Sequence, residues 1–340
     1  MGLSMTLPQH RSSVSRVRGR VRSLLAGLLV LSGGLLGSQA ALAIDASRSG
    51  LPWPSGQSCF DRGDSPMAQV EAWRGHPYDV IVGWAPRTTF AAMVDWFERG
   101  NYRKIARLPP TPVVSVPLLT QEVPGQFAAC AAGAFDDHFR RIAKAARANN
   151  RPDTVFRLGW EANGSWYPWS IGNDPEGYKA CFRHVVDTIR SELPGATISW
   201  PMAKQGHLAY DVTKAYPGDA YVDIVGLSFY DRYPIAPDQK AWDDQYQRTR
   251  YGGPFGLKSW LAFATAHGKK LSFDEWGISD NGQGFDNAFF IKAMTDFFAR
   301  NAKSIAFEAY YNCGEGAYQV YPESDNPNAG AAYREAYLAR

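Results

Sequence analysis

The sequence predicts an α/β protein built as a single (β/α)8 barrel, the TIM-barrel fold, over residues 44–340. Short apolar or β-branched runs alternate about eight times with helix-like segments, and the roughly 297 residues involved suit an α/β barrel formed as one domain. An open, doubly wound sheet is the alternative. No Gly-x-Gly-x-x-Gly motif follows an early strand, which weakens the dinucleotide-binding form of that alternative.

Eight segments are expected to form the barrel strands, because each is a short apolar or β-branched run bounded by Pro, Gly or polar residues. In chain order they are residues 56–60, 78–85, 112–119, 154–161, 197–202, 222–230, 270–276 and 304–311. The first is the weakest of the eight.

Five segments between these strands carry helix signals, and they cover residues 65–75, 88–100, 125–150, 174–193 and 284–302. Ser65 before Pro66, and Asp174 before Pro175, have the form of an N-cap followed by a first-turn proline. Gly100 is a plausible C-cap. Since no repeat, low-complexity tract or linker interrupts residues 50–340, one domain is the economical interpretation.

Residues 1–43 have the features of a secretory signal peptide. Five arginines between Arg11 and Arg22 precede an apolar run at 24–36, and the small-residue site Ala41-Leu42-Ala43 follows. The apolar run is too short to span a bilayer, although a membrane anchor is the alternative. We therefore expect cleavage near Ala43 and export to the periplasm or the extracellular space, without a stable membrane anchor.

Charge and histidine content argue against several classes of function. Removing residues 1–43 takes away five arginines and no acidic residue, so the formal net charge changes from +3 to −2. No basic footprint for nucleic acid remains. The six histidines are scattered without an HExxH motif, which predicts no catalytic metal and no other cofactor, and no GxSxG motif indicates an esterase. Nothing demands more than a monomer.

The four cysteines are expected to form two disulfides, because export leads to an oxidising compartment. Four cysteines allow three pairings. The barrel model favours Cys59–Cys313, since the first and eighth strands are neighbours, and Cys130–Cys181, which would join neighbouring helices. Metal ligation is a weak alternative, because no two cysteines are close in the sequence.

Two glutamates occupy the ends of predicted strands. Glu161 ends the fourth and Glu275 the seventh, and barrel active sites gather at the carboxyl ends of strands. One protonated and one ionised carboxyl group suit glycoside hydrolysis. Because strand side chains alternate, Arg157 should share the inward face with Gly159 and Glu161. It should reach toward Glu275 and keep that group ionised, with Gly159 leaving room between them.

The aromatic side chains around Glu161 suit a sugar-binding cleft. Trp166, Tyr167 and Trp169 are candidate stacking platforms for the apolar faces of sugar rings, and the amide of Asn163 is a candidate hydrogen-bond partner for a sugar hydroxyl. The alternative is that these aromatic side chains simply cap the barrel core.

The motifs R-L-G-W-E-A-N-G-S-W (157–166) and D-E-W-G (274–277) resemble those of glycoside hydrolase family 26. That family contains β-mannanases, some mixed-linkage β-glucanases and β-1,3-xylanases, within a clan of retaining (β/α)8-barrel glycosidases. The resemblance implies that Glu161 is the general acid/base, that Glu275 is the nucleophile and that Trp166 forms a wall of the −1 subsite. Tyr230 matches the tyrosine beside the nucleophile, and Arg157 matches the arginine four residues before the acid/base.

Three departures from the family pattern bear on the substrate. Trp160 stands where the family's mannanases usually have His, no His follows the third strand, and Tyr310, Tyr311 and Asn312 occupy a region that usually holds Trp. The retaining mechanism is unaffected. A β-mannan-like polysaccharide is the expected substrate, and a mixed-linkage β-glucan or a bacterial exopolysaccharide is the alternative. Trp160, Trp276 and Tyr310 complete the predicted substrate-binding set.

Other polar residues receive weaker assignments. Asp274 should point away from Glu275 as a structural partner, and Glu308 could be a buried, paired residue. Loop residues that could line the cleft are Asp231, Asp280, Glu315 and His207. A non-catalytic carbohydrate-binding barrel, a polysaccharide lyase and an esterase are the other classes considered. Both glutamates are present in suitable contexts, which argues against the first, and the base or nucleophile of the others is not found.

Overall fold

The computed structural model describes residues 2, 44–58, 67–313 and 316–340. Residues 44–340 belong to one compact unit, as a single domain requires. Nearly all of the predicted signal peptide lies outside the described residues, so both the signal and its cleavage site stay predictions. No helix in the described ranges combines the length and the apolar character needed to cross a membrane.

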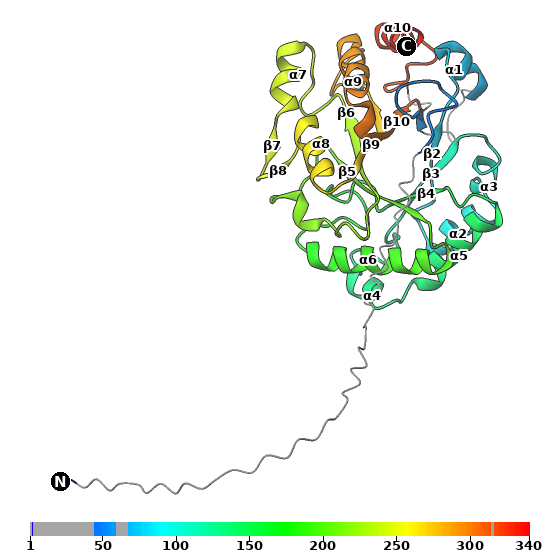
Figure 1. Ribbon diagram of the computed structural model, residues 1–340, viewed down its shortest axis with the longest axis vertical. Coiled ribbons are helices and arrows are strands. Elements are labelled where there is room, and N and C mark those ends of the chain that lie inside the picture. The colour runs from blue at the N-terminus through cyan, green and yellow to red at the C-terminus, as the bar shows by residue number, and fades with distance from the viewer. Residues whose placement is uncertain (1, 3–43, 59–66, 314–315) are drawn as a thin grey trace, which may run out of the picture. The chain divides into compact units, whose positions relative to one another are not determined.

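The predicted barrel is confirmed: eight parallel strands in the described part of the chain close on themselves, with the last pairing to the first (Figure 1). The strands are β1 (Ser55–Ser58), β2 (Val80–Trp84), β3 (Thr111–Val116), β4 (Val155–Leu158), β5 (Thr197–Ala203), β6 (Ile224–Tyr230), β9 (Lys270–Gly277) and β10 (Ile305–Tyr311). Each follows its neighbour in chain order around the barrel.

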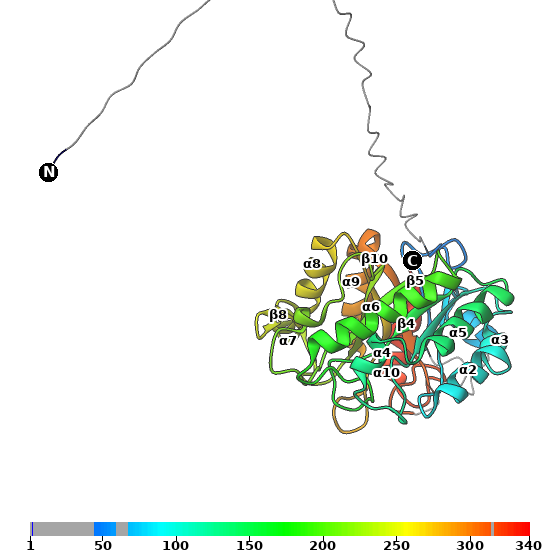
Figure 2. The ribbon, with the colours of Figure 1, turned by 90° about the horizontal axis from the view of Figure 1, so that it is seen from below.

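Helices surround the barrel and cover its outer surface (Figures 1 and 2). They are α1 (Met67–Arg74), α2 (Phe90–Glu98), α3 (Tyr102–Ile105), α4 (Phe127–Ala131), α5 (Asp136–Ala148), α6 (Pro175–Glu192), α7 (Gln239–Tyr246), α8 (Leu257–Ala266), α9 (Ala288–Arg300) and α10 (Pro327–Leu338). Short 3₁₀ turns are η1 (Val212–Ala215) and η2 (Ala302–Ser304), and β7 (Thr249–Arg250) pairs with β8 (Gly253–Pro254) as a separate antiparallel hairpin.

Local signals located some helix ends well. The Asp174 side chain accepts a hydrogen bond from the Gly177 amide at 2.8 Å, and Pro175 is the first residue of α6, as expected of a capped start. Helix α2 ends at Glu98 with Arg99 as its C-cap, so Gly100 lies one residue beyond the cap. Ser65 and Pro66 lie outside the described residues.

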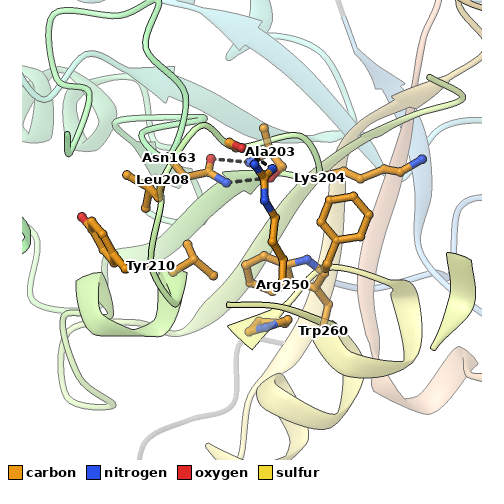
Figure 3. Close-up of a pocket in the computed structure, with 11 residues that line it drawn as sticks. Asn163, Ala203, Lys204, Leu208, Tyr210, Arg250 and Trp260 are labelled. Atoms are coloured by element: carbon orange, nitrogen blue, oxygen red, sulfur yellow. Dashed lines mark hydrogen bonds between the residues drawn. The ribbon is translucent and has the colours of Figure 1, made fainter. Parts of the chain in front are cut away.

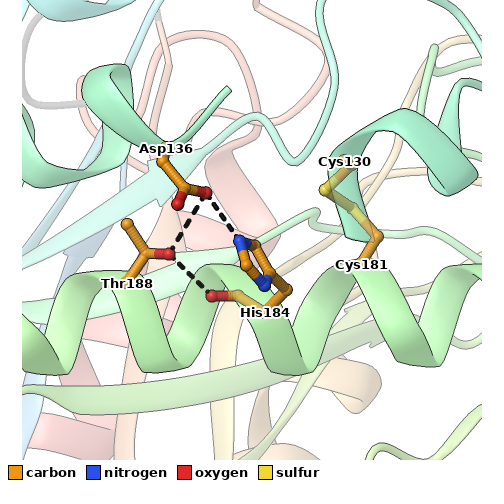
Figure 4. The surroundings of a disulfide bond; sticks show 5 residues. All are labelled: Cys130, Asp136, Cys181, His184 and Thr188. Atoms are coloured by element: carbon orange, nitrogen blue, oxygen red, sulfur yellow. Dashed lines mark hydrogen bonds and ion pairs between the residues drawn. A yellow bond between two sulfur atoms is a disulfide. The ribbon is translucent and has the colours of Figure 1, made fainter. Parts of the chain in front are cut away.

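The single long helix predicted over residues 125–150 is wrong. The segment forms two helices, α4 and α5, and Gly133 lies between them with φ +85°, a conformation that ends a right-handed helix. Both helices are tied to α6 (Figure 4): Cys130 of α4 is disulfide-bonded to Cys181, and Asp136 of α5 accepts from His184 Nε2 at 2.7 Å. Tertiary contacts therefore hold the break.

The predicted Cys130–Cys181 disulfide is confirmed, whereas Cys59 lies outside the described residues and its pairing with Cys313 stays a prediction. The confirmed bond closes a sequence separation of 51 residues. Replacing both Cys130 and Cys181 with serine should lower the free energy of unfolding by about 4 kcal/mol, the loop-closure entropy for a loop of this length. Urea denaturation of the double variant tests this, and an unchanged midpoint would contradict it.

The apolar core lies between the strands and the helices. Side chains that point outward from β6 and β9, such as Phe229, Phe273 and Trp276, pack against Phe290 and Phe298 of α9. The inside of the barrel is different, because hydroxyl, guanidinium and carboxylate groups occupy it near the carboxyl ends of the strands. This polar interior carries the candidate site.

Candidate active site

Arg157 is the hub of the polar interior. Its side chain is 0% exposed, and Nη1 donates to Ser115 Oγ of β3 at 2.9 Å while Nη2 donates to Ser228 Oγ of β6 at 2.9 Å. Nε donates to Asp274 Oδ2 at 2.9 Å, and Nη1 also donates to Glu275 Oε1 at 2.5 Å. Burial by itself lowers the pKa of Arg157, but the two carboxylates outweigh it and hold the pKa above its ordinary value.

Asp274 does not point away from Glu275, so that prediction is wrong. Both consecutive side chains contact Arg157, because the register between β6 and β9 shifts between Gly226 and Ser228 and breaks the simple alternation. Gly226 makes room for Asp274: a Cβ on this glycine would lie 2.3 Å from Asp274 Oδ2. Burial raises the pKa of Asp274 despite the contact with Arg157.

Glu275 is held by a donor on each of its carboxylate oxygens. Arg157 donates to Oε1, and the Tyr230 hydroxyl donates to Oε2 at 2.9 Å. The residue is 7% exposed, so these two donors replace most of the water around it. Burial and the charge of Glu275 raise the pKa of Tyr230, so its phenol stays protonated and remains a donor.

Glu161 lies three residues beyond the end of β4, not within the strand as predicted. Gly159 has φ +56° and Glu161 has φ +53°, so the chain leaves the strand in a turn and the strict alternation ends at Leu158. The Glu161 amide donates to the Pro201 carbonyl of β5 at 2.9 Å, which anchors this turn to the next strand. Non-glycine residues adopt this conformation at a cost, commonly where function requires it.

Gly159 also has a different role from the one predicted. It does not open space between Arg157 and Glu275. A Cβ at this position would lie 3.1 Å from Leu118 Cβ and 3.3 Å from Trp169 Cδ1, so glycine allows close packing of the turn against these apolar side chains. The positive φ is a second reason for glycine here.

The carboxyl group of Glu161 is electrostatically unlike that of Glu275. Burial, and next the negative charge of Glu275, raise the pKa of Glu161 to about 7. Arg157, the Ser228 hydroxyl and the Trp166 indole oppose that rise. Near neutral pH, Glu161 therefore exists in both protonated and ionised forms and can give or take a proton.

Trp166 forms an exposed wall beside Glu161. Its Nε1 donates to Glu161 Oε2 at 3.0 Å, and 45% of the residue is exposed. Its ring contacts the ring of His207 edge-on, with the centroids 5.1 Å apart. An indole held at the carboxyl group and open to solvent has the geometry that a sugar-stacking surface needs.

Trp169 of the predicted aromatic platform and Trp160 of the predicted substrate-binding set are buried. Trp169 is 0% exposed, stacks on Tyr167 at 4.6 Å and donates through Nε1 to the Trp160 carbonyl at 2.8 Å. Trp160 is also buried and packs against both of these rings. Their predicted contact with substrate is wrong for this structure, because they fill the core beneath the turn. Tyr167 is half-buried, so part of its ring stays accessible.

Asn163 is likewise a structural residue. Its Nδ2 donates to the Ala203 carbonyl at 2.7 Å and its Oδ1 accepts from the Ala203 amide at 2.8 Å (Figure 3). This buried pair of bonds joins the turn after β4 to the end of β5. The predicted hydrogen bond from this amide to a sugar is contradicted, since both polar ends already bind protein.

The predictions for Trp276 and Tyr310 are also wrong, because both point outward from the barrel. Trp276 donates to Glu308 Oε2 at 2.6 Å, and Tyr310 donates to the Tyr318 carbonyl at 3.0 Å. Alternation places the next residue of β10, Tyr311, on the inner face, where its ring lies 5.7 Å from Tyr230. Tyr311 is therefore the residue of this pair that lies beside the site.

The remaining polar candidates have mixed outcomes. Glu308 is buried and paired as expected, with donors from Trp53, Trp276 and Tyr337. Asp231 is buried rather than exposed in the cleft, and it accepts from Asn287 and the Ala236 amide. Asp280 and His207 are exposed, and Glu315 lies outside the described residues. No group of three or more potential metal ligands occurs among the residues with described positions.

Ser115 and Ser228 are site residues that the sequence did not single out, and Tyr311 was noted only as a departure from the family pattern. Ser228 lies two positions before Tyr230 on β6, so alternation alone could have placed the two on one face. Ser115 carries no such local signal, because its contact with Arg157 comes from the pairing of β3 with β4.

The chain is similar to known glycoside hydrolases in both sequence and fold. Residues 134–252 match the family model for glycosyl hydrolase family 26; the matched stretch contains Arg157 and Glu161 and ends before Glu275. Among curated proteins, a mannan endo-1,4-beta-mannosidase of Bifidobacterium adolescentis is 27% identical over 207 residues, covering 56% of this chain and 20% of that protein. Endoglucanase H of Acetivibrio thermocellus is 30% identical over 213 residues, covering 60% of this chain and 22% of that protein.

The chain thus spans about a fifth of the length of these two relatives. Among solved structures, the catalytic domain of a Bacillus sp. JAMB-750 GH26 endo-beta-1,4-mannanase shares the fold with a TM-score of 0.61 at 18% identity, over 88% of this chain and 89% of that one. Residues 134–252 are therefore similar in sequence to glycosyl hydrolase family 26, mannan endo-1,4-beta-mannosidases are among the similar curated proteins, and the barrel is similar in fold to that of a solved GH26 mannanase.

Proposed function

We propose that the chain is a secreted retaining endo-β-glycosidase that hydrolyses a polysaccharide by double displacement, with Glu161 as general acid/base and Glu275 as nucleophile. One observation carries the proposal: the environment separates the two carboxyl groups. Glu161 has a pKa raised to about 7, whereas each carboxylate oxygen of Glu275 accepts a hydrogen bond, one from Arg157 and one from Tyr230.

The two steps use these states in turn. Protonated Glu161 donates its proton to the glycosidic oxygen, while a Glu275 oxygen attacks the anomeric carbon and the leaving sugar departs. The product is a glycosyl ester on Glu275. In the second step, ionised Glu161 takes a proton from water, and the resulting hydroxide cleaves the ester and restores both groups. A pKa near 7 suits a group that works in both directions near neutral pH.

A β-mannan-like chain is the proposed substrate class. Similar curated proteins include mannan endo-1,4-beta-mannosidases, an endoglucanase and a beta-1,3-xylanase, so related sequences act on several polysaccharide backbones. A β-glucan or a bacterial exopolysaccharide is the alternative. The exposed indole of Trp166 beside Glu161 supports a stacked sugar at the bond that is cut.

The test is reducing-sugar release by residues 44–340 from β-mannan, mixed-linkage β-glucan, β-1,3-xylan and bacterial exopolysaccharides. Release from one polymer that disappears in the Glu161→Gln and Glu275→Gln variants would support the mechanism and name the substrate. A folded wild-type protein that binds a polymer without cutting it would indicate a carbohydrate-binding barrel instead.

The proposal predicts a pH profile with a defined sign. Because Glu161 must be protonated in the first step and has a pKa of about 7, kcat/KM should fall about tenfold per pH unit above pH 7. Trp166→Phe removes a donor to the ionised carboxylate, so the pKa of Glu161 should rise further and the falling limb should move to higher pH. Rates of polymer cleavage between pH 4 and 10, measured for both proteins, test this. A limb that moves to lower pH in the variant would contradict the assignment.

A further inference from the structure

A groove lies beside the candidate catalytic centre and has no role in the double displacement. It encloses about 640 Å³, within the usual range of ligand-binding sites. The loops after β5 and β6 and the β7–β8 hairpin supply its walls, which include His207, Tyr233, Arg248, Arg250 and Phe255.

The groove begins one side chain away from the catalytic pair. His207 lines the groove and contacts the Trp166 ring edge-on, while its Nδ1 lies 2.7 Å from Ser165 Oγ. Trp166 in turn donates to Glu161. A polysaccharide lying across Glu161 and Glu275 would therefore continue past Trp166 into this groove.

The groove is positively charged. Its lining, among residues with described positions, includes two arginines and neither Asp nor Glu. Arg248 is exposed, and its guanidinium has no hydrogen bond or ion pair within the described ranges. Asp244, an acidic group close enough for Arg248 to lower its pKa, is paired with Lys240 at 2.8 Å. This local excess contrasts with the net charge of −2 expected for residues 44–340.

Arg250 is held in place but not neutralised. Its Nη1 donates to the Gly206 carbonyl at 2.8 Å, and its guanidinium lies 5.4 Å from the centre of the Tyr251 ring. Figure 3 shows the side chain extending toward Asn163 and Ala203. A guanidinium has five N–H donors, so several remain for a ligand.

The groove also presents apolar surface. Tyr233 is 57% exposed, and Phe255, which also lines the groove, is partly exposed. Aromatic faces suit the apolar side of a sugar ring, whereas two guanidinium groups without a counter-ion suit a carboxylate, which they bind in a bidentate geometry. The hydroxyl groups of a neutral sugar do not supply that charge.

We propose that this groove is a subsite for a carboxylate-bearing sugar, of the hexuronic acid or pyruvylated type, within the polysaccharide that is cut between Glu161 and Glu275. This inference rests on the proposed function, and it specifies an acidic rather than a neutral substrate chain.

The test measures binding without turnover. The Glu161→Gln protein is titrated calorimetrically with oligosaccharides of alternating glucuronic acid and mannose, and with the same oligosaccharides after chemical reduction of the carboxyl groups to alcohols. The acidic probe should bind about tenfold or more tightly than the reduced one, consistent with one desolvated charge-assisted contact. Raising the salt concentration should reduce the difference in affinity between the acidic and the reduced probe. Equal binding of the two probes, or no binding of either, would overturn the proposal.

Further substitutions in the Glu161→Gln protein test whether the preference for the acidic probe comes from this groove. Arg248→Gln combined with Arg250→Gln should abolish the preference for the acidic probe without weakening the reduced probe. Arg103→Gln is the matched control, because this exposed arginine lies on α3, at the opposite flank of the barrel from the β7–β8 hairpin (Figure 1). A preference that survives in the double variant would place the charge recognition elsewhere.

Failure of this inference can be separated from failure of the proposed function. Hydrolysis of neutral polymers by the wild-type protein, lost in Glu275→Gln, would support the function even if the two probes bound equally. Selective binding of the acidic probe without hydrolysis of any polymer would support the subsite and argue against the function.

Discussion

Replacing Glu275 with glutamine is expected to eliminate measurable polysaccharide hydrolysis, while Glu161→Gln should slow it by about 10²- to 10⁴-fold. An amide cannot form the glycosyl ester, whereas loss of a proton donor slows departure of the leaving group without preventing it. The difference between the two variants follows from the different surroundings of the two groups, with Glu275 held by Arg157 and Tyr230 and Glu161 kept at a raised pKa.

Aryl glycosides with an acidic leaving group separate the two roles. Such substrates need little protonation, so Glu161→Ala should form the ester readily, and azide should then release it as a glycosyl azide of retained configuration. Asp243→Ala is the matched control, because it also truncates an acidic side chain, on the exposed face of α7. Azide rescue of the Glu275 variant instead of the Glu161 variant, with the same stereochemistry, would reverse the assignment.

Replacing Arg157 with methionine is expected to cost about 3–5 kcal/mol of the free energy of unfolding at pH 7. The substitution leaves Asp274 and Glu275 in the barrel interior without their cation, and buried charges are unstable when unpaired. Urea denaturation measures the loss. The free energy of unfolding of Arg157→Lys should lie between those of the wild type and Arg157→Met. Lysine keeps the positive charge but lacks the planar guanidinium that reaches two carboxylates and two serine hydroxyls.

The loss of stability in Arg157→Met should depend on pH. Burial already raises the pKa of Asp274 above its unfolded value, and removal of Arg157 raises it further. A raised carboxyl pKa contributes stability that is present at low pH and is lost as pH rises through the folded-state value. The deficit relative to wild type should therefore shrink as pH falls toward about 4, and Asp274→Asn should partly restore Arg157→Met at pH 7. A deficit that is constant with pH would show that packing, not charge, is responsible.

Local patterns predicted the barrel and some of its detail. Apolar runs and capping residues are short-range features, so the eight strands and the Asp174-capped start of α6 could be identified from neighbouring residues. The prediction of one helix over residues 125–150 was wrong because the chain turns at Gly133, where φ is positive. The contacts that hold this turn come from α6, which lies outside any local stretch of sequence.

Strict alternation failed at two points in the site. A register shift between β6 and β9 turned Asp274 inward together with Glu275, and the left-handed turn at Gly159 and Glu161 ended β4 early. Both are departures from regular strand geometry that depend on what the neighbouring strand and loop accommodate. The same reason explains why Trp169 and Asn163, which suggest sugar binding by residue type, are occupied within the protein.

The sequence by itself determined the class of fold, the two candidate carboxylates, Arg157 as a partner of Glu275, and one disulfide, whereas Tyr230 was expected only from the resemblance to a family. These depend on residue identity and on spacing along the chain. Only the tertiary structure decided that the pKa of Glu161 is raised, which aromatic rings remain exposed, and that Arg248 and Arg250 line the same groove as His207. Burial, electrostatic neighbours and surface shape arise from segments far apart in the sequence, and they exist only once the barrel has closed.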